Sequence, residues 1–343
     1  MKNIKFYSAI DKIEKEKWTD FYKNHDHSNF YQSIEMFEFW GHQKNYKSFI
    51  FFLESSDGKC LGFCTGVIVP TGKSKTKNPN RSALIYGGPL IKDENKEILE
   101  IFINKIGKYL KFKSKYIEFR NFRTDLILKD TFIKNNWKYT PKLNYFIHLV
   151  SEEEVYNKFD SSRRREIRRA YRDGVEVSYE KSQENLIAVY NILSGIFKMN
   201  DKVMALPIPD FAFLSNLLLL KNSRMVTLTY NNKVIGGGFF VYDNNRIYHW
   251  FRGGLNRDHN KQSPDAVVDW EVMKFGLEHK IPLFDYMGAG TKGQDNRLRK
   301  YKSRFGGELV EIGMYSRINF PLWFRIENKI IRTLRKYIPF IVN

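Results

Sequence analysis

Residues 225–242 read MVTLTYNNKVIGGGFFVY, and this pattern predicts a β-hairpin. Apolar and polar side chains alternate before Asn231-Asn232-Lys233, which supplies the residue types that favour a tight turn. A second stretch, Phe49–Pro70, has the same design, and the spacing from Lys59 to Gly62 in it equals that from Lys233 to Gly236. The two hairpins therefore predict a repeated unit.

The same order of elements follows each hairpin. Apolar residues at helical spacing run from Ile98 to Phe112 and again from Val267 to Glu278, and each run leads into a short strand. A short helix and a last strand then close each half. The expected segments are strand 116–119, helix 132–137 and strand 145–150 in the first half, and strand 282–286, helix 301–305 and strand 308–314 in the second. Three matches in the same order indicate a duplication.

The repeat predicts the fold class and the domain boundaries. Each half is expected to be a mixed, mostly antiparallel sheet flanked by helices, because a helix that crosses between two strands packs back on their sheet. The chain is therefore predicted to be an α/β (α+β) protein, with one domain over residues 1–150 and a second over 151–318. Ser151 and the three glutamates after it predict a capped helix at the start of the second domain.

The remaining residues, 319–343, predict a basic amphipathic helix. Between Phe320 and Ile338, apolar side chains interleave with five lysines and arginines. Two placements stay open, because such a helix can pack its apolar face on the first domain or lie on an anionic membrane surface. Trp323 and Phe324 favour the first placement, since large aromatic side chains are costly to leave in water.

The charge of the chain restricts its partners. Its 343 residues include 57 Lys and Arg and 38 Asp and Glu, which gives a net charge of +19. Phosphate-bearing partners or an anionic membrane surface are therefore expected. The longest apolar stretch, Phe211–Leu220, is too short to span a bilayer, and the first 18 residues lack the continuous apolar core of a signal peptide. We expect a cytoplasmic protein.

The two cysteines predict neither a disulfide nor a metal site. Cys60 and Cys64 lie four residues apart on one predicted strand. This spacing separates them by roughly 13 Å, whereas a disulfide needs about 7 Å or less between Cα atoms. No His or Cys cluster nearby in the sequence completes a zinc site, and neither thiol has a base placed to activate it as a nucleophile.

Residues 161–172 read SSRRREIRRAYR and place six arginines in one predicted helix. A solvated helix face is one interpretation. An anion-binding site is the other, because Arg163, Arg164 and Arg165 would lie in the first turn, where the helix dipole disfavours cations. An anionic ligand would remove that penalty, and arginine binds phosphate oxygens with two parallel hydrogen bonds. The phosphates of a nucleic acid or a pyrophosphate are the candidate ligands.

A second candidate site lies on the strand after the later hairpin. Tyr248, Trp250 and Arg252 alternate, so they are expected to project from one face as a stacking surface, although simple sheet-to-helix contacts explain the aromatic residues equally well. His249 then faces the other way and is interpreted as a core histidine. The three glycines at 236–238 predict a bulge or a close approach of another segment.

The densest group of candidate residues comes last. The segments FDYMGAG (284–290) and RLRKYKSRFGGE (297–308) place a carboxylate at a strand end, glycines after it and a basic helix beyond. Asp285 is placed to orient an amine or accept its proton, and Lys302 to stabilise a developing oxyanion or bind phosphate. A strand, a glycine turn and a surface helix would give the same pattern without any chemistry.

These features together resemble one protein family. The tandem arrangement, the segment from Ser162 to Val177, the helix DWEVMK (269–274) and the sequence YKSRFGGE (301–308) are similar to the FemABX family of peptidoglycan-bridge aminoacyl transferases. In the first half, Gln32-Ser33, Trp40 and the sequence YGGP at 86–89 are similar to family segments that face the cell-wall precursor.

The resemblance implies two GNAT-like domains, an aminoacyl-tRNA donor, and an amine of a nucleotide- or lipid-linked peptidoglycan precursor as acceptor. It implies neither a metal nor a bound cofactor, and a lipid-linked acceptor would bring the protein to the inner face of the membrane. It assigns charge stabilisation at the reacting carbonyl to Lys302, a neighbouring position to Tyr301 and the acceptor groove to Tyr248, Trp250 and Arg252. Arg304, Trp40 and Tyr86 are further substrate-binding candidates.

Two other functions stay open. The first is an acyl-CoA-dependent N-acyltransferase that acts on an amino sugar or a polysaccharide intermediate. GNAT domains that use CoA hold its pyrophosphate on backbone amides of a glycine-containing loop before the central helix. Residues 255–266 contain no glycine, and Ser263-Pro264 instead predicts an N-cap and first helical residue, which favours tRNA over CoA. The second is a basic RNA-binding or membrane-surface module, which leaves Asp285 and Lys302 without a role.

Overall fold

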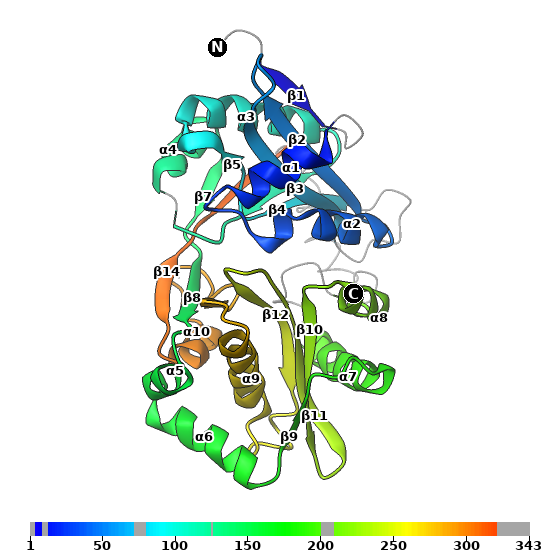
Figure 1. The fold of residues 1–343 in the computed structure, drawn as a ribbon, viewed down its shortest axis with the longest axis vertical. Coiled ribbons are helices and arrows are strands. Elements are labelled where there is room, and N and C mark those ends of the chain that lie inside the picture. The colour runs from blue at the N-terminus through cyan, green and yellow to red at the C-terminus, as the bar shows by residue number, and fades with distance from the viewer. Residues whose placement is uncertain (1–3, 9–12, 72–79, 125, 200–208, 321–343) are drawn as a thin grey trace, which may run out of the picture. The chain divides into compact units, whose positions relative to one another are not determined.

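The computed structural model describes residues 4–8, 13–71, 80–124, 126–199 and 209–320. The chain forms two compact units, of which the first contains the residues up to Pro141 and from Ile312 onward, and the second contains Lys142–Glu311. Each unit is a mixed sheet flanked by helices, which confirms the predicted fold class (Figure 1). Along the chain, each predicted hairpin is followed by a helix, a strand, a short helix and a last strand in the expected order, but the first short helix is Leu126–Lys134 and not 132–137.

The first unit has an eight-stranded sheet in the order β1-β2-β3-β4-β6-β15-β7, with β5 paired to β3. Its strands are β1 (Lys5–Tyr7), β2 (Lys47–Glu54), β3 (Cys60–Thr71), β4 (Asn80–Tyr86), β5 (Leu90–Ile91), β6 (Tyr116–Arg120), β7 (Lys138–Thr140) and β15 (Met314–Ile318). Its helices are α1 (Lys15–Lys23), η2 (Phe30–Gln32), α2 (Ile34–His42), η3 (Lys92–Glu94), α3 (Lys96–Leu110) and α4 (Leu126–Lys134). Strands β4 and β6 are parallel.

The second unit has a seven-stranded sheet in the order β14-β8-β13-β12-β11-β10-β9. Its strands are β8 (Leu143–His148), β9 (Glu176–Ser178), β10 (Ser223–Tyr230), β11 (Lys233–Tyr242), β12 (Ile247–Gly254), β13 (Leu283–Asp285) and β14 (Glu308–Glu311). Its helices are α5 (Glu152–Lys158), α6 (Ser161–Arg172), α7 (Gln183–Met199), α8 (Phe211–Leu219), α9 (Pro264–Glu278) and α10 (Arg297–Ser303). Strands β12 and β13 are parallel.

The two units exchange their last strands, which moves the domain boundary. The strand expected to close the first domain, β8, pairs with β13 and β14 in the second sheet. In return, β15 pairs with β6 and β7 in the first sheet. The chain therefore crosses between units at 141/142 and 311/312, whereas the sequence placed the boundary at 150/151. Apolar alternation marks a strand but does not say which sheet the strand joins.

Glycines in β11 allow helices to approach the second sheet closely from both faces. A Cβ atom on Gly237 would lie 2.5 Å from Val189 of α7, and one on Gly238 would lie 3.1 Å from Val268 of α9. Because neighbouring strand residues face opposite sides, α7 and α9 cover opposite faces of the sheet. The predicted close approach at residues 236–238 is confirmed.

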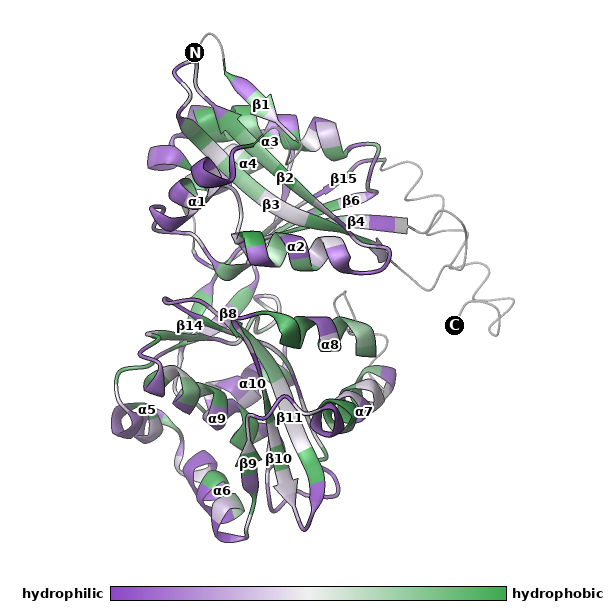
Figure 2. Cartoon of the chain, turned by 45° about the vertical axis from the view of Figure 1, so that its right-hand side comes forward, coloured by the Kyte–Doolittle hydropathy of each residue, from purple (hydrophilic) through white to green (hydrophobic). Residues whose placement is uncertain are grey.

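The structure also bears on other local predictions. Ser151 caps α5, since its hydroxyl accepts a hydrogen bond from the backbone N–H of Glu154. Strand β2 lies largely in the hydrophobic colour and helix α6 largely in the hydrophilic colour in Figure 2. Among the residues that the structure describes, no helix is long and apolar enough to cross a bilayer. The amphipathic helix expected at 319–343 lies, from residue 321 onward, outside the described residues.

Candidate functional site

A buried carboxylate in the second unit contacts three polar side chains. Asp269 of α9 is fully buried and accepts hydrogen bonds on Oδ2 from Arg252 Nη1 and from the Tyr301 hydroxyl, the latter at 2.8 Å. His249 Nδ1 lies 3.0 Å from Asp269 Oδ1. We name these four residues the Asp269 cluster. Burial opposes ionisation, but the Arg252 and His249 side chains hold the pKa of Asp269 below its ordinary value.

A β-bulge brings Arg252 to this cluster. Phe239 pairs with Phe251 and Phe240 with His249, so Trp250 is an extra residue on β12. The bulge turns Arg252 to the α9 face together with His249, while the Trp250 ring lies against Phe213 of α8 at 5.6 Å. The expectation that Tyr248, Trp250 and Arg252 project from one face is therefore wrong. The glycines at 236–238 on the neighbouring strand predicted a bulge or a close approach, but no pattern in the sequence of β12 marks the extra residue.

Two further sequence-based interpretations can be compared with these positions. His249 is buried beside Asp269, which confirms a core histidine with a partner. Tyr248 is 1% exposed, and its hydroxyl lies 3.4 Å from Asp243 Oδ2, so its ring does not reach the surface of the unit. Within the second unit, Arg252 and Tyr301 are the candidate residues that join one cluster.

Lys302 lies one residue beyond Tyr301 on α10, at the carboxyl end of β13. Its ammonium group donates hydrogen bonds to the backbone carbonyls of Tyr286, at 2.9 Å, and Gly288. The side chain is buried, and burial together with the positive charge of Arg252 lowers the pKa of Lys302 to about 7. The two carbonyls accept hydrogen bonds from two of the three N–H groups of the Lys302 ammonium. The third position on Nζ is an N–H donor when the lysine is charged and a lone pair when it is neutral.

Asp285 is the last residue of β13, and both of its carboxylate oxygens accept hydrogen bonds from the protein around it. Its Oδ1 accepts hydrogen bonds from Asn144 Nδ2 and from the Met287 N–H, each at 2.6 Å, and its Oδ2 accepts one from Arg246 Nη1 at 3.2 Å. Burial raises the pKa of the carboxyl above its ordinary value in spite of Arg246. These contacts fasten β8, β13 and the glycine turn together, so the geometry assigns Asp285 a structural position.

The three arginines at the start of α6 have three different surroundings. Arg163 is 2% exposed and lies with its guanidinium 4.5 Å from the ring centre of Tyr301, while its Nε and Nη2 have no hydrogen-bond partner. Arg164 donates to the carbonyls of Asn157 and Phe159, and Arg165 is exposed. The structure therefore does not bring the three together in one anion site.

Arg304 also has protein partners at this end of α6. It donates hydrogen bonds to Asp160 at 3.0 Å, to Ser162 at 2.6 Å and to Glu166 at 2.8 Å. The side chain thereby joins the end of α10 to the start of α6. Its expected substrate contact stays a prediction.

In the first unit, Trp40 and Tyr86 belong to a buried aromatic stack. Their rings lie 6.1 Å apart and nearly parallel, and Tyr31 stacks on Tyr86 at 4.8 Å. The Tyr86 hydroxyl accepts a hydrogen bond from Arg120 at 3.1 Å, and Arg120 also pairs with Glu118. No sequence pattern singled out Arg120 or Glu118 as site residues. Their position at the end of the strand that follows a helical crossover was the signal available.

Two asparagines beside Gly87 and Gly88 were also missed. The side-chain nitrogens of Asn29 and Asn121 are buried without a hydrogen-bond partner. Both glycines have positive φ, and a Cβ on Gly87 would collide with Asn29. This corner of the first unit holds two unused amide donors.

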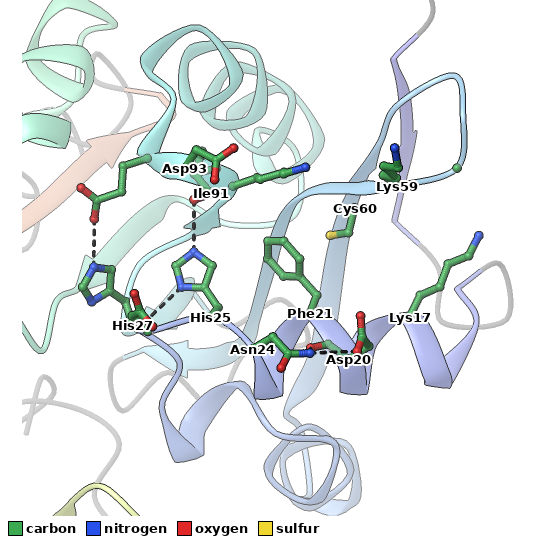
Figure 3. Close-up of a pocket in the computed structure, with 14 residues that line it drawn as sticks. Lys17, Asp20, Phe21, Asn24, His25, His27, Lys59, Cys60, Ile91 and Asp93 are labelled. Atoms are coloured by element: carbon green, nitrogen blue, oxygen red, sulfur yellow. Dashed lines mark hydrogen bonds and ion pairs between the residues drawn. The ribbon is translucent and has the colours of Figure 1, made fainter.

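The first unit also contains a cavity of about 650 Å³ that none of the predicted site residues line (Figure 3). His25 accepts a hydrogen bond on Nδ1 from the His27 N–H at 3.2 Å, so its Nε2 carries a proton and donates to the Ile91 carbonyl at 3.1 Å. His27 Nε2 lies 3.0 Å from Glu94. Burial lowers the pKa of both histidines and raises that of the Cys60 thiol. These side chains fasten a loop and present no activated nucleophile.

The described residues hold no group of three His, Cys, Asp or Glu side chains that fits a metal ion.

Comparison with known proteins identifies this architecture. Residues 157–303, within the second unit, match the family of acetyltransferase (GNAT) domains. The structure of FemX superposes with a TM-score of 0.70 at 14% identity, over 94% of this chain and 100% of that chain. The chain has the tandem GNAT fold of FemX. The resemblance to the FemABX family is thereby confirmed at the level of the fold, and the second unit contains the stretch that matches acetyltransferase (GNAT) domains.

Two other solved structures share the fold. A tandem GNAT protein from the clavulanic acid biosynthesis pathway has a TM-score of 0.57 at 8% identity, over 92% of this chain and 99% of that one. L-PGS from Bacillus licheniformis has a TM-score of 0.54 at 12% identity, over 93% and 97% of the two chains. No curated protein matches the sequence.

Proposed function

We propose that this GNAT-fold acyltransferase moves an aminoacyl group from aminoacyl-tRNA to an amine of a peptidoglycan precursor. The FemABX-like motifs at 269–274 and 301–308 support this proposal, as do the fold shared with FemX and the net charge of +19. The choice of tRNA over CoA as donor rests on one observation: the backbone N–H groups at the start of α9 already donate hydrogen bonds within the protein.

A CoA pyrophosphate would need free N–H groups at the start of α9, and none is available among the first residues of that helix. Pro264 has no N–H, Asp265 N–H donates to the Asn256 side chain, and the N–H groups of Ala266 and Val267 donate to the Ser263 carbonyl. Asp265 also places a carboxyl group in the first turn, where it opposes an anion. Pro264 begins the helix as expected, but Ser263 does not cap it with its side chain.

The reaction would proceed by direct attack. The nitrogen of the acceptor amine forms a bond to the carbonyl carbon of the aminoacyl ester, and the C–O bond to the tRNA ribose then breaks. The ribose oxygen leaves as a hydroxyl, with the proton that the nitrogen loses and that solvent relays. The negative charge that develops on the carbonyl oxygen would meet the third N–H of protonated Lys302, a type of contact whose loss costs about 10²- to 10³-fold in rate. No covalent enzyme intermediate is needed, since burial raises the pKa of both Cys60 and Cys64.

Within this proposal, Arg252 and the Asp269 cluster have a positioning role. Burial lowers the pKa of Lys302 most, Arg252 lowers it further, and Asp269 raises it. The Arg252–Asp269 pair thereby adjusts how far Lys302 is charged near neutral pH.

The alternative donor is an acyl-CoA, with an amino sugar or a polysaccharide intermediate as acceptor. The description of the matched domain family as acetyltransferases favours it. The occupied amides at the start of α9 argue against it.

A binding and transfer experiment separates the two donors. Purified protein is incubated with tRNA carrying labelled amino acids, or with labelled acetyl-CoA, and an amine acceptor of the peptidoglycan-precursor type. The proposal expects saturable binding of aminoacyl-tRNA and transfer of label to the precursor amine. Saturable binding of CoA with acetyl transfer, and none from tRNA, would contradict it.

A further inference from the structure

The turn between α3 and β6 carries an exposed aromatic ring among lysines. Phe112 is 82% exposed, and residues 108–115, KYLKFKSK, contain four lysines and no acidic residue. Lys111 Nζ lies 5.5 Å from the Phe112 ring centre, and Lys113 Nζ covers the Tyr109 ring at 3.2 Å. We name residues 108–115 the lysine turn.

Hydrogen bonds hold the lysine turn at one end of the first sheet. The Lys115 N–H donates to the Arg81 carbonyl at 2.9 Å, and the Asn319 N–H donates to the Lys115 carbonyl at 3.0 Å. Asn319 Nδ2 also donates to the Ser114 carbonyl at 2.7 Å. The turn therefore lies where β4 and β6 begin, at the end of the sheet opposite to Tyr86. Its exposed ring is not part of the aromatic stack in the candidate site.

We infer that the lysine turn docks the first unit on an anionic lipid surface. A membrane interface accepts an aromatic ring at the boundary of headgroups and acyl chains, while ammonium groups on flexible stems reach the lipid phosphates. Single-stranded RNA fits this turn less well, because it stacks on successive aromatic platforms and Phe112 is the one fully exposed ring here. This inference stands apart from the proposed acyl transfer and does not depend on its donor.

The lysine turn could instead be covered by another part of this chain, and the experiment distinguishes that case from lipid docking. The Phe320 ring lies 5.8 Å from that of Phe112, so the chain after residue 320 starts beside the turn. Cover by that segment would make Phe112 a stability determinant. Docking on lipid makes it a determinant of vesicle binding.

The experiment measures co-sedimentation of the full chain with phosphatidylcholine vesicles that contain or lack phosphatidylglycerol. Two variants test the turn: Phe112→Ser, and the double variant Lys111→Gln with Lys113→Gln. Leu219→Ser is the matched apolar control, because Leu219 is 81% exposed in the second unit. Lys233→Gln with Lys280→Gln is the matched charge control, because both lysines are exposed in that unit.

The expected result is binding only to vesicles with phosphatidylglycerol. Phe112→Ser lowers the partition coefficient about tenfold, and loss of two lysines lowers it about tenfold or more, since each basic residue contributes several-fold. The control variants stay within about twofold of the parent. Equal losses in the turn variants and their matched controls would overturn the inference, because binding would then depend on net charge and exposed apolar area anywhere on the chain. Parental vesicle binding by Phe112→Ser would overturn it as well, and a lowered melting temperature in that variant would indicate cover by the chain after Phe320.

Discussion

The two units share one topology but join their parallel strands differently. In the first unit, β4 and β6 pair at five positions, Ser82–Tyr86 with Tyr116–Arg120. In the second, β12 and β13 pair at two, Ile247 and Tyr248 with their partners on β13, and β12 continues to Gly254. Arg252 and Lys302 lie beyond the last pair. Because β12 and β13 stop pairing early, side chains and not backbone hydrogen bonds fill the space between their carboxyl ends.

The units also differ in the charges that they bury. Among the described residues of the first unit, Glu54 is the one buried side chain of an ionisable Asp, Glu, Lys, Arg or His. The described residues of the second unit bury six: Arg163, His249, Asp269, Glu271, Asp285 and Lys302. Buried charges cost stability unless they are paired, and their concentration in the second unit is the reason for placing the proposed acyl transfer there.

The largest expected effect comes from breaking the Asp269 cluster. Asp269→Asn removes the charge that compensates Arg252, and loss of one partner of a buried ion pair costs about 3–5 kcal/mol. The comparable change in the first unit, Glu118→Gln beside half-buried Arg120, is expected to cost about 1 kcal/mol or less. Urea denaturation of both variants measures the two unfolding free energies. Equal losses would contradict the difference drawn between the units.

A glycine substitution tests the close approach of α7 to the second sheet. Gly237→Ala places a Cβ 2.5 Å from Val189 and 2.7 Å from the Val226 carbonyl, so it is expected to cost about 1–3 kcal/mol. Gly195→Ala in α7 is the matched control, because no atom lies within 4 Å of its Cβ position. It is expected to stabilise the helix by about 0.5–1 kcal/mol. Thermal unfolding of the two variants shows the signs, and a stable Gly237→Ala protein would contradict the proposed contact.

Lys302 predicts a pH dependence that Lys302→Met removes. Folding lowers the pKa of Lys302 from 10.5 to about 7, so between these values the unfolded chain holds a proton that the folded chain has released. The free energy of unfolding of the parent therefore rises with pH relative to the variant, by up to about 1.4 kcal/mol per pH unit. Urea denaturation at pH 7, 8 and 9 measures the difference. Parallel pH profiles would show that Lys302 keeps an ordinary pKa.

The sequence allowed the fold to be predicted because its hairpins and helices repeat in order, and it allowed Tyr301 and Lys302 to be singled out as a motif. Strand exchange was missed, since the alternation in 143–148 is the same in either sheet. The Asp269 cluster was missed for another reason. Asp269 is brought to Arg252 by a bulge at Trp250 and by the register of α9 on the sheet, and neither is written in a local pattern.

The arginine helix teaches a related point. Adjacent helical residues point about 100° apart, so Arg163, Arg164 and Arg165 cannot share one ligand face. Arg163 is buried against Tyr301, and Arg164 binds carbonyls at the end of α5. The high density of arginine in the sequence indicated a candidate binding segment. Which of these arginines a ligand can reach depends on how deeply each side chain is buried.

The most direct test compares single-turnover acyl transfer by Lys302→Met and Arg120→Met at saturating acceptor. Lys302→Met keeps the length of the side chain and removes its N–H donors, whereas Arg120→Met makes the matched change at the strand end of the first unit. If the second unit carries the chemistry, Lys302→Met lowers the rate about 10²- to 10³-fold and Arg120→Met lowers it less than about tenfold. A parental rate in Lys302→Met, with both variants folded, would contradict the account.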